Sequence, residues 1–184
     1  RLLIAVITII IFYLSGCLNN KEVKSLELKE TQKEFLFNYK EYCGFAYKGR
    51  SVLVNLGENH QLENAELLMI IDKCSDDEVR IKFYVNEDRS RTWILMLTKQ
   101  GLHLSHDHRY EDGTQYANNW YGGYADEQGT NFIQFFPADH RTILDRPARA
   151  INVWSKEFDK KNNLYFYHLY LDGELRYEAE FDLS

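Results

Sequence analysis

The last part of the chain alternates without a break between hydrophobic and polar residues. Successive side chains of a strand point to opposite faces, so this stretch has one hydrophobic face and one charged face. The inward set is Leu175, Tyr177, Ala179, Phe181 and Leu183, and the outward set is Arg176, Glu178, Glu180 and Asp182. Asp172-Gly173 joins this strand to the preceding run NLYFYHLYL, which predicts a β-hairpin.

One segment has helical spacing instead. Hydrophobic residues recur at intervals of three and four positions between residues 35 and 43, Thr31 and Glu34 have the spacing of a capping box, and Gly44 is a stop signal. We predict one amphipathic helix over about 32–43. The run NLYFYHLYL is hydrophobic on both faces, so we expect this helix to cover its second face.

Further strands are predicted at 46–55, 66–73, 78–85, 92–98, 102–109, 116–122, 131–136 and 150–158. Most connections are short, but PADHRTILDRPARA is long enough to hold a helical turn. Some ten antiparallel strands in meander order leave wide edges unless the sheet curls. The sequence therefore predicts a mainly β fold, a meander closing into a lipocalin-like barrel with one N-terminal helix. A two-sheet sandwich is the alternative.

The N-terminal residues have a different pattern. Leu2 to Leu14 form a hydrophobic run that suits a signal-peptide core and is too short for an ordinary spanning helix. Leu14-Ser15-Gly16-Cys17 resembles a bacterial lipobox, in which Cys17 is acylated and becomes the mature N-terminus. The alternative is an ordinary secretory cleavage site with a chance cysteine. We expect a signal peptide at 1–16, a lipidated tether at 17–30 and a single β-rich domain at 31–184.

The lipobox resemblance implies a location. The protein would be anchored to the lipid bilayer of the bacterial cell envelope through Cys17, with the folded domain outside the cytoplasm. Leu18 and Asn19 follow, with no Asp next to Cys17, which favours the outer membrane. With Cys17 set aside, Cys43 and Cys74 are an even pair in an oxidising compartment, and a disulfide between them would stabilise by roughly 3–4 kcal/mol. Two buried free thiols are the alternative.

Composition excludes some partners. The net charge is −6 and no basic block occurs, so nucleic acid and anionic lipid surfaces are poor partners. With 13 Tyr, 11 Phe and 3 Trp against 2 Pro, the chain is rich in strand formers and far from disordered.

The stretch LHLSHDHRYEDGT, residues 102–114, holds three of the six histidines. On a strand, Leu102, Leu104, His106 and His108 share one face, while His103, Ser105, Asp107 and Arg109 share the other. If the leucines face the core, His106 and His108 enter the barrel mouth. Such a pair can chelate a metal with a third ligand, for which the candidates are His140, Asp139, Glu111 and His60. None of these spacings is diagnostic, so we predict no metal or other cofactor, and His106, His108 and His140 remain weak metal candidates.

The tripeptide Asp-His-Arg occurs twice, at 107–109 and 139–141. Three interpretations stay open: a structural network, a binding site for a polar or anionic ligand, and a metal or acid–base catalytic site. The network is favoured, with Arg109 and Arg141 paired to acids among Asp107, Glu111, Asp112 and Asp139. No G-x-S-x-G, H-E-x-x-H, phosphate-loop or CxxC motif occurs, while paired carboxylates for glycoside cleavage stay open.

The segment YANNWYGGYAD offers aromatic faces beside side-chain amides, as a sugar-binding surface requires. The alternative is a strand whose aromatics fill the core and whose Gly122-Gly123 makes a bulge or turn. His168 is interpreted as a satisfied buried histidine. The candidate ligand-binding residues are His106, Asp107, His108, Arg109, Glu111, Asp112, Trp120, Tyr121 and Asp139.

Several motifs together carry a resemblance. LxHDHRYEDG, YGG, GTNFIQFFPAD, NVW and the closing EFDLS resemble a set of uncharacterised bacterial secreted proteins and lipoproteins, over about residues 44–184. The likeness lies in Leu104, His106, Asp107, His108, Arg109, Glu111, Asp112, Gly113, Tyr121, Gly122, Gly123, Pro137, Ala138 and Asp139. It implies an exported domain and no particular activity. His140, which follows PAD here, departs from the pattern, and this weakens it as a metal ligand.

We therefore expect an extracytoplasmic lipoprotein that binds a small molecule or glycan in the mouth of a β-barrel. A hydrolase that uses His106 or His108 is the first alternative. An envelope protein that acts through its surface is the second.

Overall fold

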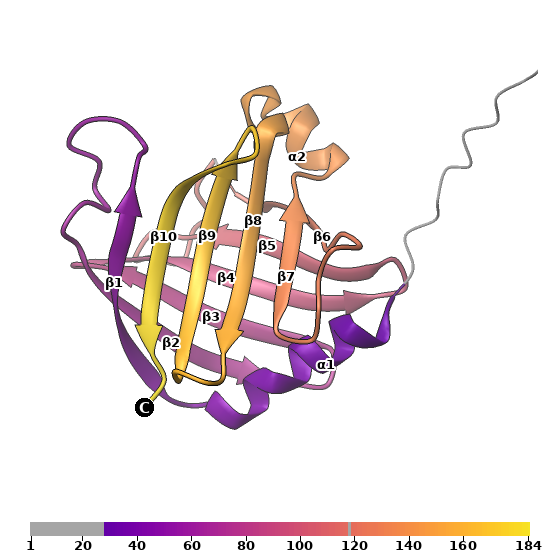
Figure 1. Cartoon of the computed structure of the whole chain (residues 1–184). Helices are drawn as coiled ribbons and strands as arrows, with labels where there is room; N and C mark the ends of the chain where they lie inside the picture. The colour runs from indigo at the N-terminus through magenta and orange to yellow at the C-terminus, as the bar shows by residue number, and fades with distance from the viewer. Residues whose placement is uncertain (1–27, 118) are drawn as a thin grey trace, which may run out of the picture.

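The computed structural model describes residues 28–117 and 119–184. The predicted signal peptide, the lipobox with Cys17 and nearly all of the predicted tether lie outside the described residues. Ten strands form one antiparallel sheet in the order β6-β5-β4-β3-β2-β1-β10-β9-β8-β7 (Figure 1). The strands are β1 (Ala46–Val54), β2 (Glu66–Cys74), β3 (Glu78–Val85), β4 (Asp88–Thr98), β5 (Gly101–His108), β6 (Tyr121–Tyr124), β7 (Ile133–Pro137), β8 (Asn152–Asp159), β9 (Leu164–Leu171) and β10 (Glu174–Asp182).

The first and last strands of this order, β6 and β7, lie side by side and nearly close the sheet into a barrel. The backbone N–H of Asp126 donates to the carbonyl of Phe135, and that of Asp139 donates to the carbonyl of Gly122, each at 2.9 Å. A Cβ atom on Gly123 would lie 1.8 Å from the carbonyl oxygen of Pro137, so only glycine permits this approach. The predicted barrel is confirmed and the sandwich alternative is not.

The alternation predicted for the last strand also holds. Tyr177, Ala179, Phe181 and Leu183 are buried, and the turn Asp172-Gly173 has positive φ at both residues, as a tight hairpin requires.

One end of the barrel is closed by the helix α1 (Glu30–Asn38) and the 3₁₀-helix η1 (Tyr39–Tyr42) (Figure 1). The Tyr39 ring packs on Phe158 of β8 at 4.8 Å between centroids, and its hydroxyl lies 2.7 Å from that of Tyr165. Gln32 accepts a hydrogen bond at 3.0 Å from the N–H of Leu102, where β5 begins.

Our expectation that the helix covers the outer face of NLYFYHLYL is wrong. The helix contacts inward-facing Tyr165, because a barrel needs its open end covered more than its outer wall. The outward Phe166 and Tyr170 are half-buried among neighbouring side chains, including His168.

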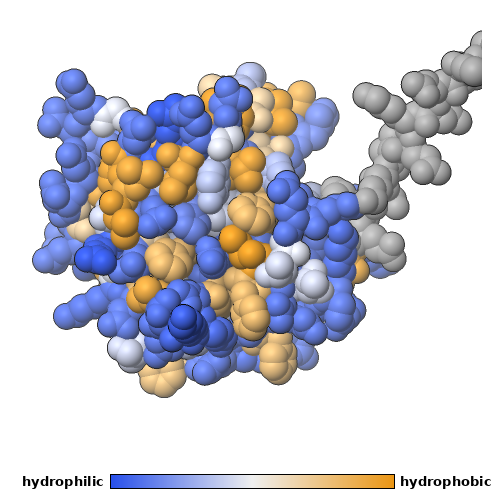
Figure 2. Space-filling view, in the orientation of Figure 1, coloured by the Kyte–Doolittle hydropathy of each residue, from blue (hydrophilic) through white to orange (hydrophobic). Residues whose placement is uncertain are grey.

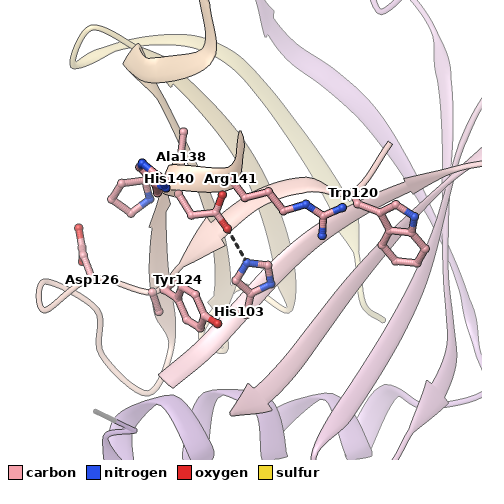
Figure 3. A pocket seen from close by; sticks show the side chains of 10 residues that line it. His103, Trp120, Tyr124, Asp126, Ala138, His140 and Arg141 are labelled. Carbon is pink, nitrogen blue, oxygen red and sulfur yellow. Dashed lines mark hydrogen bonds and ion pairs between the residues drawn. The ribbon is translucent and has the colours of Figure 1, made fainter. Parts of the chain in front are cut away.

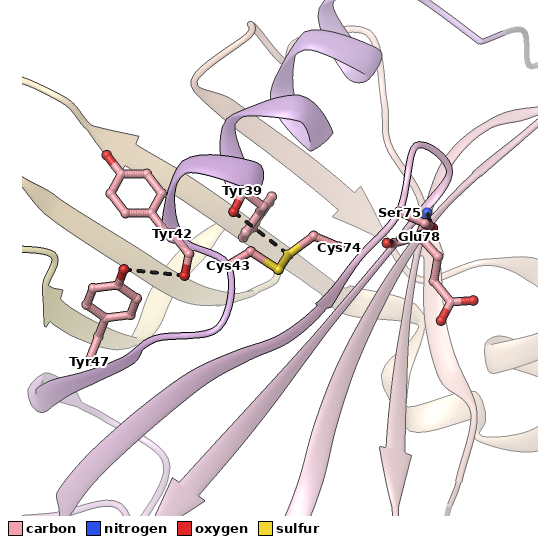
Figure 4. The surroundings of a disulfide bond; sticks show 7 residues. All are labelled: Tyr39, Tyr42, Cys43, Tyr47, Cys74, Ser75 and Glu78. Carbon is pink, nitrogen blue, oxygen red and sulfur yellow. Dashed lines mark hydrogen bonds between the residues drawn. A yellow bond between two sulfur atoms is a disulfide. The ribbon is translucent and has the colours of Figure 1, made fainter.

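The Cys43–Cys74 disulfide is present and ties the end of η1 to the last residue of β2, with 6.2 Å between the two Cα atoms (Figure 4). Next to it, Gly44 has φ +87° and its N–H donates to the carbonyl of Ile71 at 2.7 Å. The predicted stop after the helix is confirmed, since this positive φ favours glycine.

Two local predictions are wrong. The capping box of Thr31 and Glu34 does not form, because the helix begins at Glu30 and the side chain of Gln32 instead accepts from the N–H of Lys29. The strand predicted at 116–122 is reduced to β6, which begins at Tyr121. Trp120, with φ +61°, turns the chain sharply just before β6, so an extended strand cannot run through it.

The long connection between β7 and β8 holds the helical turns that we expected. They are α2 (His140–Asp145) and the 3₁₀-helix η2 (Pro147–Ile151). The outer surface seen in Figure 2 is mainly hydrophilic, with hydrophobic residues in small groups. Among the described residues, no helix has the length and apolar character needed to cross a membrane.

Candidate functional site

The end of the barrel opposite α1 opens into a cavity of about 510 Å³. Residues of β3, β4, β5, β6, β9 and β10 form its walls, and residues of the connections complete its rim. The lining residues are Leu56, His60, Gln61, Leu62, Phe83, Asp88, Ser90, Arg91, Trp93, His106, His108, Tyr116, Tyr121, Arg149, Tyr167, Leu169 and Tyr177. The structure therefore brings His106 and His108 together in the barrel mouth, with His60 nearby.

Two arginines give this cavity its positive charge. Arg91 of β4 donates through Nη1 to Asp88 at 2.5 Å, so its charge is partly compensated. Arg149, on the 3₁₀-helix that begins at Pro147, lies with its guanidinium 3.9 Å from the centre of the Tyr121 ring. Among the described residues, no carboxylate lies within ion-pair distance of Arg149.

Aromatic rings form the deeper wall of the cavity. Phe83 and Trp93 stack at 4.4 Å between centroids, and Trp93 and Tyr167 lie 4.5 Å apart. Such rings present flat hydrophobic surface with little conformational freedom to lose, which suits the binding of an apolar or aromatic group.

His106 is buried and both of its ring nitrogens have partners. Nδ1 donates to the carbonyl of Tyr121 at 3.1 Å, which leaves Nε2 to accept from the hydroxyl of Tyr167 at 3.4 Å. Burial, followed by the nearby Lys156, holds the pKa of His106 well below the ordinary histidine value. The ring is therefore neutral at pH 7, and its roles are hydrogen bonding and packing against Tyr121.

His108 lies nearer to the mouth and faces the same cavity. Its Nε2 is 3.1 Å from the hydroxyl of Tyr121, and its backbone N–H donates to Asn119. Burial, followed by the charge of Arg91, lowers the pKa of His108 to about 4. Both histidines of the pair are thus uncharged, so the positive charge of the cavity comes from its arginines.

A lysine lies beneath this aromatic wall. Lys156 of β8 is completely buried, with its Nζ 2.8 Å from the centre of the Trp93 ring and 3.9 Å from that of Tyr167. No hydrogen-bond partner reaches this Nζ within the described structure. Burial holds the pKa of Lys156 well below the ordinary lysine value.

Asp107 and Arg109 lie on the other face of β5 and form a structural network. Arg109 donates to Asp107 at 2.8 Å and to the carbonyl of Gly113 at 3.0 Å, and Asn119 donates to the second oxygen of Asp107. Asp112 caps the turn by accepting from Thr114. These groups hold the loop after β5. Glu111 is exposed in the same loop, and both Asp112 and Glu111 lie outside the cavity.

Asp139 and Trp120 belong to a second pocket of about 600 Å³ on the outside of the barrel, over the junction of β6 and β7 (Figure 3). His103 lies with its Nε2 2.9 Å from Asp139, which also accepts from the N–H of Thr142 at the start of α2. Burial alone would raise the pKa of Asp139, but the hydrogen bonds from His103 and Thr142 outweigh it and lower that pKa.

His140 lines this outer pocket and not the cavity of His106 and His108, so the barrel wall separates it from both. In the part of the chain that the structure describes, no three His, Cys, Asp or Glu residues form a group that could hold a metal ion. His168, on the outer wall, lies 2.8 Å from the Ser155 hydroxyl and 3.2 Å from Glu178, as expected of a satisfied histidine.

Comparisons of the chain with protein-family models, with curated proteins and with solved structures give no match.

Three cationic residues were missed by the sequence interpretation. On β4, Arg91 is two residues from inward Trp93, and on β8, Lys156 stands between inward Trp154 and Phe158. The spacing of two along a strand places both cationic side chains on the interior face. Arg149 lies in a connection with no strand period, so no comparable signal exists for it.

Proposed function

We propose that the domain binds a small anionic ligand with an apolar or aromatic part in the cavity at the open end of the barrel. The observation that supports this proposal most directly is Arg149. It lies on the cavity wall against Tyr121, and no described carboxylate pairs with it. A guanidinium matches carboxylate or phosphate groups through two parallel hydrogen bonds, so an anion is the complement that it lacks.

The remaining lining residues suit the rest of such a ligand. The rings of Phe83, Trp93 and Tyr167 offer hydrophobic surface, while His108 and Tyr121 offer hydrogen-bonding groups near the mouth. A cavity of about 510 Å³ lies within the range of roughly 300–1,000 Å³ typical of small-molecule sites.

Two dyes with nearly the same rings test this proposal. 8-Anilino-1-naphthalenesulfonate carries an anionic group, and N-phenyl-1-naphthylamine lacks it. In fluorescence titrations we expect Arg149→Gln to weaken binding of the sulfonate about tenfold, since a charge-assisted hydrogen bond is worth about 1.5–3 kcal/mol. We expect binding of the neutral dye to change less than about twofold.

Arg141→Gln is the matched control, because Arg141 is exposed and lines the outer pocket. It should leave binding of both dyes unchanged. The proposal fails if Arg149→Gln leaves the sulfonate titration unaltered, or if Arg141→Gln carries the loss instead.

We also propose that the domain is exported and anchored in the bacterial cell envelope by acylation of Cys17. The Cys43–Cys74 disulfide supports this, since disulfides persist in oxidising compartments. Metabolic labelling with an alkyne palmitate analogue should mark the mature protein, which begins at Cys17, in the membrane fraction. Cys17→Ser should lose the label, and a labelled Cys17→Ser protein would contradict the proposal.

A further inference from the structure

Among the described residues, Lys156 is the one buried lysine, with no exposed surface and no hydrogen-bond partner for its Nζ. It stands on β8 between Trp154 and Phe158, and all three side chains face the barrel interior. A buried amine without a hydrogen-bond partner costs stability, so its presence in the interior calls for an explanation. The proposed ligand binding does not by itself use this group.

The surroundings of Nζ connect it to the cavity. Its nearest aromatic neighbours are the rings of Trp93 and Tyr167, and both rings also line the cavity. A ligand in the cavity is therefore separated from the amine by those rings, and contact with the amine requires one of the two rings to move. The neutral His106 adjoins the same position through the Tyr167 hydroxyl.

The chemical state of the amine suits nucleophilic attack. Burial lowers the pKa of Lys156, so the uncharged form, which carries a free electron pair, is favoured. Exposed Lys160 is the opposite case, because hydrogen bonds from its ammonium to Glu41 and Tyr42 outweigh partial burial and raise its pKa. Desolvation of a lysine in a hydrophobic site is an established way to activate it toward carbonyl groups.

We propose that Lys156 forms an imine with a carbonyl compound, an aldehyde or ketone bearing an anionic group, that enters the barrel cavity. The nitrogen lone pair attacks the carbonyl carbon and a C–N bond forms, after which a proton moves from nitrogen to oxygen. The C–O bond then breaks while the second proton of the nitrogen passes to the departing hydroxyl, so that a C=N bond forms and water leaves, and the step consumes no oxidant or reductant. The inference rests on the proposed function, because Arg149 would hold the anionic group.

Reductive trapping tests it. The full chain is incubated at pH 7 with 4-carboxybenzaldehyde and sodium cyanoborohydride, which converts an imine to a stable secondary amine, and is then measured by intact mass and peptide mapping. We expect one adduct, on Lys156, forming at least tenfold faster than any adduct on Lys160. Arg149→Gln should slow the reaction with this aldehyde more than the reaction with uncharged benzaldehyde.

Two lysine variants provide the matched comparison. Lys156→Met places an unbranched hydrophobic side chain in a hydrophobic site, so it should fold and lose the adduct, while Lys160→Met should keep it. Adducts spread over exposed lysines without Lys156, or an unchanged adduct in Lys156→Met, would overturn the proposal.

Displacement of 8-anilino-1-naphthalenesulfonate by the same aldehyde, without reductant, separates the two proposals. Displacement without an adduct on Lys156 means that the cavity binds anions and that the imine does not form. Neither displacement nor adduct means that the aldehyde does not enter the cavity and that the imine proposal fails, while the sulfonate titration of Arg149→Gln decides the binding proposal.

Discussion

The two ends of the barrel are built from the same strands and differ in the kind of group that faces the interior. At the closed end, Tyr39 and Tyr165 pair their hydroxyls, and the ring of Phe158 contacts both. The open end holds Arg149, which has no carboxylate partner among the described residues, and behind its aromatic wall lies Lys156, whose Nζ has no hydrogen-bond partner. On β8, Lys156 and Phe158, which belong to these two regions, are two residues apart. The closed end is thus organised for stability, and the open end gives up stability for groups that a ligand can use.

The largest effect should come from breaking the closed end. Phe158→Ala removes a ring that contacts Phe35, Tyr39, Tyr42 and Tyr165. We expect the free energy of unfolding to fall by about 3–5 kcal/mol, measured by denaturant titration. Arg149→Gln at the open end should change it by no more than about 0.5 kcal/mol. Equal losses in the two variants would abolish the contrast between the ends.

The disulfide fastens the lid of the closed end. Replacing Cys43 and Cys74 together with serine should lower the free energy of unfolding by about 2–4 kcal/mol, because the unfolded chain gains conformational freedom. Reductant should destabilise the wild type by a similar amount and leave the double variant unaffected. A double variant as stable as the oxidised wild type would mean that packing alone holds the helix in place.

At the open end a substitution should increase stability. Lys156→Met removes the cost of burying an unpartnered amine, so we expect a gain of about 1–3 kcal/mol at pH 7. The pKa of Lys156 is lowered in the fold, so the stability that the wild type lacks at neutral pH returns as pH rises toward the ordinary lysine value. The gain should therefore shrink between pH 7 and pH 10. A loss of stability in this variant would show that the amine is satisfied.

The smallest expected effect concerns His108. Its pKa is about 4 in the folded protein, below the ordinary value of about 6.5, so the fold favours the neutral ring. The contribution of the neutral His108 ring to the free energy of unfolding is complete above about pH 6.5 and is lost as pH falls toward 4. His108→Asn should reduce that loss by on the order of 1 kcal/mol, because solvent screens the partly exposed ring. Denaturant titrations at pH 7 and pH 4.5 measure it, with exposed His140→Asn as a control that should match the wild type.

Much of the fold was predictable because it depends on local patterns. The period of two located most strands and assigned their faces, Asp172-Gly173 marked a hairpin, and the even cysteine pair predicted a disulfide that is present. The failures occurred where side chains override a local pattern. Asn119 reaches Asp107 and the backbone of His108, and Trp120 turns the chain, so the strand expected at 116–122 starts late.

The sequence by itself determined that His106 and His108 share one face of β5 with Leu102 and Leu104, because alternation on a strand is fixed by backbone geometry. That this face points into the barrel was shown only by the structure. Only the tertiary structure decided what surrounds them. It closed the sheet at Gly122-Gly123 and brought Arg149 and Lys156 toward the same end of the barrel as the histidine pair, while placing Asp139 with His103 outside. These neighbours come from strands and connections far apart in the chain, and closure of the barrel, which no local period records, brings them together.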